Sequence, residues 1–146
     1  MATTLTFAYI RGDEMYVANV GDSRVYLAHG DMIQQITDDH TYVNDLVKMG
    51  AITKDEAHLH ARKNVITRAI GANANNEPDC FSVPVETGDR ILLCSDGLYD
   101  EVDDDTILSV LNRYKDMKVC AEDLVYMANE NGGNDNISVI CVDLED

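Results

Sequence analysis

LLCSDGLYD, residues 92–100, places an apolar run directly before an aspartate and a glycine. The apolar residues are typical of the end of a buried strand, and the Asp96-Gly97 pair is typical of the turn that follows. A carboxylate at the end of a buried strand is costly to desolvate unless a positive charge meets it. Asp96 is therefore expected to have a cationic partner.

Two further aspartates occur in a similar context. Asp22 lies in NVGDSRVY between two expected strands, and Asp135 lies in NGGNDNISVICV just before another. Taken singly, each is most simply an Asx-turn, whose carboxylate binds only nearby backbone. Taken together, strand ends at one edge of a layered sheet can converge. Carboxylates without nearby His or Cys suit hard cations such as Mg²⁺ or Mn²⁺ better than Zn²⁺.

The pattern of apolar residues predicts a single α+β layered domain over residues 1–146. Strands are expected at 3–10, 15–20, 24–29, 32–37, 80–85, 89–95 and 137–144. The first four are so closely spaced that they favour an antiparallel meander. An irregular insert follows at about 41–76, with one short helix near 43–50 and another that starts at a capping box formed by Thr53 and Glu56. Two amphipathic helices are expected around 107–114 and 121–128.

The charge of the chain excludes two classes of partner. Eleven Lys and Arg face 27 Asp and Glu, so the formal net charge is -16, which repels nucleic acid and anionic membranes. No apolar run approaches the roughly 20 residues of a membrane span, and no signal peptide is recognisable. The four cysteines form no C-x-x-C motif, which favours free thiols in a reducing compartment. A cytoplasmic protein is therefore expected.

Five segments, in order and at characteristic intervals, resemble one family. They are NVGDSRVYL, ITDDH, NVITRAIG, GDRILLCSDGLYDEV and GGNDNISVICV. Together they are similar to the metal-dependent protein phosphatases of the 2C class (the PPM family), and most closely to bacterial Ser/Thr phosphatases that oppose Hanks-type kinases. The resemblance covers about residues 3–142. It implies an α-β-β-α sandwich with two or three Mg²⁺ or Mn²⁺ ions at one edge, and hydrolysis of phosphoserine and phosphothreonine by a metal-activated water.

The same resemblance implies roles for individual residues. Asp96 and Asp135 match the core metal ligands, and Asp22 matches the acid that helps bind an additional, weaker metal in bacterial members. Residues 41–70 match the mobile flap beside the site. Separately from the resemblance, Arg62 and Arg68 are candidates for attracting a substrate phosphate, although charge balance within an acidic chain explains them equally well. The partners implied are phosphoprotein substrates, including a Ser/Thr kinase and its targets.

The chain also departs from the family pattern. Family members carry an upstream Asp-Gly-x-Gly-Gly run that supplies further metal ligands, whereas the one Asp-Gly pair here is at Asp96. We therefore expect a partial domain that lacks the N-terminal strands and helices, binds metal weakly and turns over poorly. Exposed sheet edges would then favour a homodimer. The alternative is a non-catalytic regulatory or binding module on the same scaffold.

Overall fold

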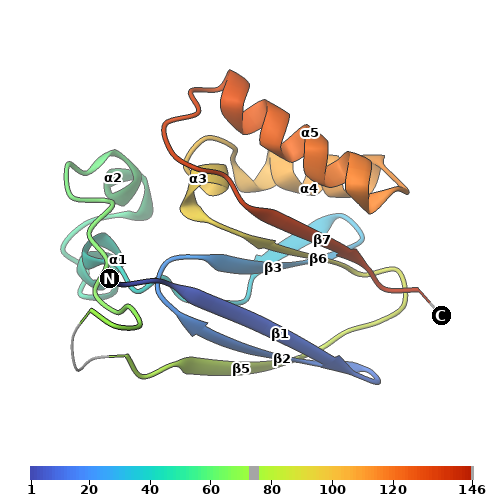
Figure 1. Ribbon diagram of the computed structural model, residues 1–146, viewed down its shortest axis with the longest axis horizontal. Helices are drawn as coiled ribbons and strands as arrows, with labels where there is room; N and C mark the ends of the chain where they lie inside the picture. The colour runs from blue at the N-terminus through green and yellow to red at the C-terminus, as the bar shows by residue number, and fades with distance from the viewer. Residues whose placement is uncertain (73–75, 146) are drawn as a thin grey trace.

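The computed structural model describes residues 1–72 and 76–145, and in this part of the chain two antiparallel sheets pack face to face with helices on one outer side (Figure 1). The elements in chain order are β1 (Leu5–Arg11), β2 (Glu14–Val20), β3 (Arg24–His29), β4 (Met32–Gln35), α1 (Tyr42–Lys48), α2 (Lys54–Leu59), β5 (Asp79–Pro84), β6 (Arg90–Cys94), α3 (Asp96–Tyr99), α4 (Asp104–Arg113), α5 (Met117–Glu130) and β7 (Val139–Asp143).

The first four strands do not form the predicted meander. One sheet has the order β1-β2-β5 and the other the order β4-β3-β6-β7, so β2 and β3 belong to different sheets. The crossing occurs at Gly21, whose φ of 114° lies in the region that favours glycine. A Cβ at this position would lie 2.3 Å from the Cγ2 atom of Thr4. The prediction was wrong because strand spacing alone does not reveal a turn that leaves the sheet.

The space between the two sheets is filled by alternate side chains of the strands. Met15 and Val17 of β2 face Val25 of β3 and Ile91 of β6, and all four are almost completely buried. This alternation is the period-two pattern of a strand with one face toward the core. The inner faces therefore hold the two sheets together, and the strand ends are fixed at the edges of the sandwich.

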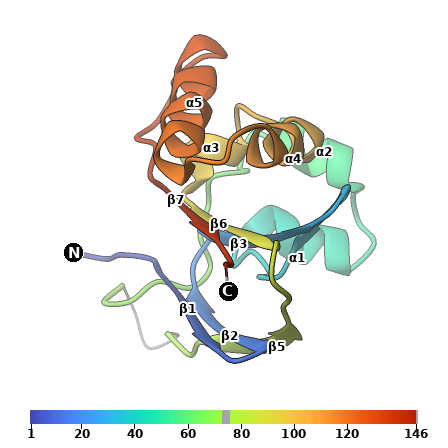
Figure 2. The ribbon, with the colours of Figure 1, turned by 90° about the vertical axis from the view of Figure 1, so that its right-hand side faces the viewer.

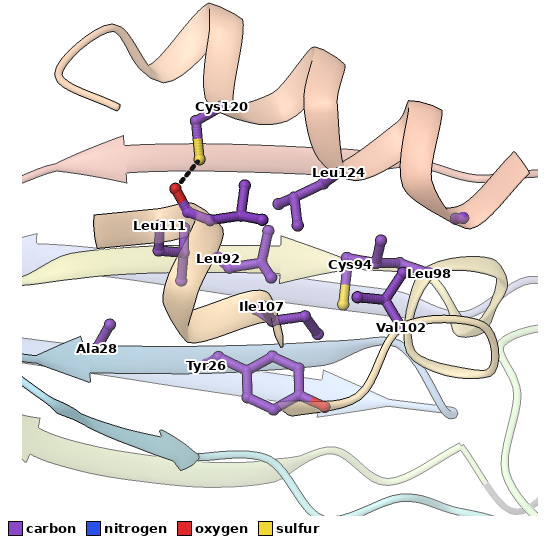
Figure 3. Packing of buried hydrophobic residues seen from close by; sticks show 12 residues of the cluster. Tyr26, Ala28, Leu92, Cys94, Leu98, Val102, Ile107, Leu111, Cys120 and Leu124 are labelled. Carbon is purple, nitrogen blue, oxygen red and sulfur yellow. Dashed lines mark hydrogen bonds between the residues drawn. The ribbon is translucent and has the colours of Figure 1, made fainter. Parts of the chain in front are cut away.

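A second core lies between the four-stranded sheet and the helices α4 and α5 (Figure 3). Leu92 from β6, Leu111 from α4 and Leu124 from α5 are fully buried there, with the thiol of Cys120 within 3.7 Å of the carbonyl oxygen of Val110. All four cysteines of the chain are free, as predicted. These helices form the single outer helical layer seen in Figure 2.

The outer face of the three-stranded sheet carries no such layer in the described residues. Leu5, Phe7 and Tyr9 of β1 and Tyr16 of β2 lie on this face, and each is between 46% and 55% exposed. β1 is an edge strand of its sheet and β7 is an edge strand of the other, and Figure 2 shows both on the same side of the sandwich. The described arrangement is therefore α-β-β.

The insert between β4 and β5 packs at one end of the sandwich (Figure 1), and residues 73–75 of the predicted insert at 41–76 lie outside the described residues. The capping box predicted for α2 is confirmed, because Thr53 and Glu56 exchange side-chain and backbone hydrogen bonds. α1 begins after Thr41, whose hydroxyl accepts the N–H of Asn44. No helix in the described ranges is long and apolar enough to cross a membrane.

Candidate metal centre

Three neighbouring strands of the four-stranded sheet, β3, β6 and β7, have one terminus each on the same side of the sheet. The three predicted metal ligands lie next to these strand termini. Arg24 at the start of β3 pairs with Cys94 at the end of β6, which in turn pairs with Val139 at the start of β7. Asp22 therefore comes just before β3, Asp96 just after β6, and Asp135 shortly before β7. We call these three aspartates the acidic edge.

Close backbone packing joins the loops that carry Asp96 and Asp135. The N–H of Ser95 donates to the carbonyl of Ser138 at 3.0 Å, and the N–H of Ser138 donates to the Ser95 hydroxyl at 3.0 Å. A Cβ added to Gly97 would lie 2.2 Å from the carbonyl oxygen of Asn136. The two loops can approach this closely because position 97 has no side chain.

The pKa values show that the three carboxylates interact. The pKa of Asp22 is raised from 3.8 to about 7, chiefly by burial and then by the negative charges of Asp96 and Asp39. Burial also raises the pKa of Asp96, and the charge of Asp135 is the next cause. Asp22 is only 6% exposed. At the acidic edge, burial and mutual repulsion thus oppose ionisation of Asp22 and Asp96.

The guanidinium of Arg24, two residues after Asp22, binds Asp39 and Tyr26 rather than the Asp22 carboxylate. Arg24 donates from Nε and Nη2 to Asp39, at 2.9 Å to Oδ1 and 2.6 Å to Oδ2 respectively, and from Nη1 to the Tyr26 hydroxyl at 2.7 Å. Its guanidinium carbon lies 3.5 Å from the ring centroid of Tyr99, and the Tyr99 hydroxyl donates to the backbone carbonyl of Asp22 at 2.6 Å. This cluster supports the backbone of Asp22 but leaves its carboxylate without a cationic partner from Arg24.

The donor set has the chemistry of a divalent cation site, although it is not a complete one. Carboxylate oxygens are the ligands that Mg²⁺ and Mn²⁺ prefer, and a cation would offset both the burial and the repulsion that raise the pKa of Asp22. In the part of the chain that the structure describes, however, no three His, Cys, Asp or Glu side chains are grouped so that they could hold an ion. The residues present therefore fit the metal in type and need further ligands in number.

An open cleft of about 680 Å³ lies between the acidic edge and the insert. Asp22 and Asp96 line it on one side, and the insert contributes Lys54, His58 and Lys63. Lys63 and His58 act to lower the pKa of Asp100, although burial is the larger effect and raises it. The cleft is lined by both carboxylates and cationic side chains, which suits a ligand that carries a phosphate together with a bound cation.

Sequence reasoning found the carboxylates but not the basic wall. Arg62 and Arg68, the predicted phosphate-attracting residues, do not line the cleft. The Arg62 guanidinium lies 4.5 Å from the ring centroid of Tyr42, and Arg68 donates to Asp79 at 3.0 Å. Lys63, which does line the cleft, is adjacent to Arg62 in the sequence. The sequence therefore indicated the right segment but not the residue that lines the cleft.

The family model described as protein phosphatase 2C matches residues 1–137 of the chain. The chain belongs to the protein phosphatase 2C family. A serine/threonine phosphatase, Stp, from Listeria innocua is 41% identical over 143 residues, which are 98% of this chain and 57% of that protein. The protein phosphatase PhpP from Streptococcus pneumoniae is 38% identical over 146 residues and is covered to 59%.

Solved structures of phosphatase 2C proteins have the same fold. The serine/threonine phosphatase Stp1 from Staphylococcus aureus matches the whole chain with a TM-score of 0.95 and 37% identity, and the chain covers 57% of it. The catalytic domain of PstP in complex with two manganese ions matches with a TM-score of 0.87 and 40% identity, and 60% of it is covered. The chain thus spans somewhat more than half the length of these relatives.

Proposed function

We propose that this chain carries the acidic edge of a metal-dependent Ser/Thr protein phosphatase. The observation that supports the proposal is the position of Asp22, Asp96 and Asp135 at three neighbouring strand ends, together with the pKa of Asp22, which is raised to about 7. The names of the relatives support the reaction class, and the PstP complex with two manganese ions supports the cofactor. The proposed substrates are proteins phosphorylated on serine or threonine, including a Ser/Thr kinase and its targets.

The proposed metal ligands are the acidic-edge carboxylates, with Asp96 and Asp135 at the centre and Asp22 at an additional position. When bound, Mg²⁺ or Mn²⁺ would activate a water and neutralise the phosphoryl oxygens. Other residues of the chain would attract the substrate and hold the acidic edge in position. The cationic side chains of Lys54 and Lys63 would attract the substrate phosphate into the cleft, and the Arg24–Asp39 pair would keep Tyr99 under the Asp22 backbone.

Low affinity and slow turnover are expected of the chain by itself. Two or three carboxylates offer few ligands to replace the water shell of a divalent ion. The test is Mn²⁺ binding, followed by electron paramagnetic resonance, together with hydrolysis of a small phosphate ester. Asp96→Asn is compared with Asp31→Asn, which removes an equal charge from an exposed turn between β3 and β4. Binding that is lost only in Asp96→Asn supports the proposal; equal binding in both variants contradicts it.

A homodimer is the second part of the proposal. β1 and β7 each have one unpaired edge in the described sheets, and such edges pair readily with another copy. The apolar face formed by Leu5, Phe7, Tyr9 and Tyr16 adjoins one of them. Size-exclusion chromatography with light scattering should show a dimer that Phe7→Lys weakens. A clean monomer at high protein concentration would rule the dimer out.

A further inference from the structure

His40 is buried between the turn that carries Asp22 and the insert that forms the other wall of the cleft. It is 4% exposed and lies two residues before α1. The backbone N–H of Gly21 donates to Nδ1 of His40 at 3.0 Å. The backbone N–H of His40 donates to the carbonyl oxygen of Gly21 at 3.1 Å. His40 therefore binds both polar groups of the residue directly before Asp22.

These contacts define the tautomer of His40. Because Nδ1 accepts the N–H of Gly21, the imidazole proton is on Nε2, and Nε2 donates to Oδ2 of Asp79 at 2.7 Å. Oδ1 of Asp79 accepts from Nη1 of Arg68 at 3.0 Å. Burial acts to raise the pKa of Asp79, but the hydrogen bonds from His40 and Arg68 outweigh it and lower this pKa. The carboxylate of Asp79 is thus the acceptor that keeps the proton on Nε2.

The backbone held in this way is an unusual one. Gly21 has a φ of 114°, and its carbonyl also accepts from Nδ2 of Asn19 at 3.1 Å. The turn is short, since β2 ends one residue before Gly21 and β3 begins two residues after Asp22. The direction of the Asp22 carboxylate therefore depends on the orientation of the Gly21 peptide, and the imidazole of His40 holds that peptide.

We propose that His40 is a positioning residue for Asp22, and that Asp79 and Arg68 hold the imidazole in the tautomer that this role requires. The inference rests on the proposed function only in that Asp22 is taken as a metal ligand. Outer-shell groups that orient a ligand typically change metal affinity about 10–100-fold when they are replaced. Since Arg68 lies in the insert and His40 directly precedes it, the same contacts connect the insert to the Asp22 turn.

Two substitutions separate the two functions of the imidazole. His40→Asn keeps an oxygen acceptor near the position of Nδ1, so it can still bind the N–H of Gly21 but cannot reach Asp79. His40→Gln keeps a donor near the position of Nε2, so it can still bind Asp79 but leaves the N–H of Gly21 without its acceptor. We expect Mn²⁺ affinity to fall about 10-fold or more in His40→Gln and at most about 3-fold in His40→Asn.

A control and a metal-free measurement accompany these variants. His29 contacts Asp89 at 2.5 Å at the far end of β3, so His29→Gln removes a similar His–Asp pair away from the acidic edge. We expect Mn²⁺ affinity to be unchanged in this control. In the metal-free protein, nuclear magnetic resonance should show faster amide exchange at Gly21 and a changed carboxyl carbon shift at Asp22 in His40→Gln, with His40→Asn close to the unmodified chain.

The outcomes distinguish the two proposals. If the unmodified chain binds no Mn²⁺, the proposed function fails, and the amide exchange of Gly21 and the carboxyl shift of Asp22 alone decide the role of His40. If His40→Asn and His40→Gln lose the same Mn²⁺ affinity, or leave Gly21 and Asp22 equally unperturbed, the positioning role is overturned. If affinity follows the acceptor at the Nδ1 position while both variants unfold at similar temperatures, the role is established.

Discussion

The core beneath α4 and α5 includes side chains of β6, the acidic edge begins just after this strand, and burial has opposite effects in the two regions. Leu92 and Asp96 are four residues apart, and both are removed from water to a large extent. Removing apolar surface from water stabilises the fold by about 25 cal/mol per Å², whereas burying like charges together costs free energy. The first region therefore accounts for stability, and the second is maintained at the expense of stability, which is typical of a binding site.

The largest expected effect is in the helical core. Leu111→Ala removes a fully buried side chain between α4 and the sheet, and it should lower the free energy of unfolding by about 2–5 kcal/mol. Urea unfolding followed by circular dichroism measures the change. A loss below about 1 kcal/mol would mean that the helices are not firmly packed on this sheet.

Asp22 should make the stability of the metal-free protein fall as pH rises. A carboxylate whose pKa is lowered by folding has the opposite effect. The folded pKa of Asp22 is raised, so the folded state holds a proton that the unfolded state has lost between pH 3.8 and about 7. Stability of the metal-free protein should therefore fall as pH rises through this window, by about 2–4 kcal/mol in all. Thermal unfolding in the presence of a chelator, from pH 5 to pH 8, measures the slope.

Asp22→Asn is the variant that isolates this contribution. The pKa of His29 is raised by Asp89 and also makes stability fall as pH rises, so the informative quantity is the difference between the unmodified chain and Asp22→Asn. The variant should be more stable than the unmodified chain at pH 8 without metal and about equal at pH 4. Added Mn²⁺ should stabilise only the unmodified chain. Parallel pH curves for the two proteins would refute the raised pKa.

A smaller effect is expected between the carboxylates themselves. Asp96→Asn removes the largest charge contribution to the pKa of Asp22, so that pKa should fall. It should stay above 3.8, because burial is the larger cause and remains. Titration of the Asp22 carboxyl carbon by nuclear magnetic resonance measures the change. An unchanged pKa would place the two side chains too far apart to share an ion.

The smallest effect should occur on the exposed apolar face. Phe7→Ala changes a side chain that is 54% exposed, so the stability of the monomer should change by less than about 0.5 kcal/mol. Measured at low protein concentration, this variant is the counterpart of Leu111→Ala. A loss comparable to that of Leu111→Ala would show that the face is covered in solution.

The sequence predicted most of the strands and helices, because their apolar residues follow clear periods of two or of three to four. It also placed Asp22, Asp96 and Asp135 beside apolar strands, and the fold brings these strand ends next to one another. That the three carboxylates share metal ions stays a prediction. It did not predict the change of sheet at Gly21, which depends on a close contact with Thr4 rather than on any local pattern.

The basic side of the cleft was also beyond prediction. Only the fold shows that Arg68 is bound to Asp79 while Lys63 lines the cleft. The same holds for the role of His40. Its contact with the peptide before Asp22 depends on a pairing of segments 19 residues apart.

Gly97 determines how closely the loop of Asp96 and the loop of Asp135 approach each other. The distance between the two loops that frame the acidic edge is set by a hydrogen atom in contact with the Asn136 carbonyl, so even a methyl group would have to push them apart. In the proposed metal site, the radius of the ion and the separation of the loops would be linked. Replacing Gly97 by alanine is thus a way to ask whether a wider opening shifts preference from smaller toward larger divalent ions.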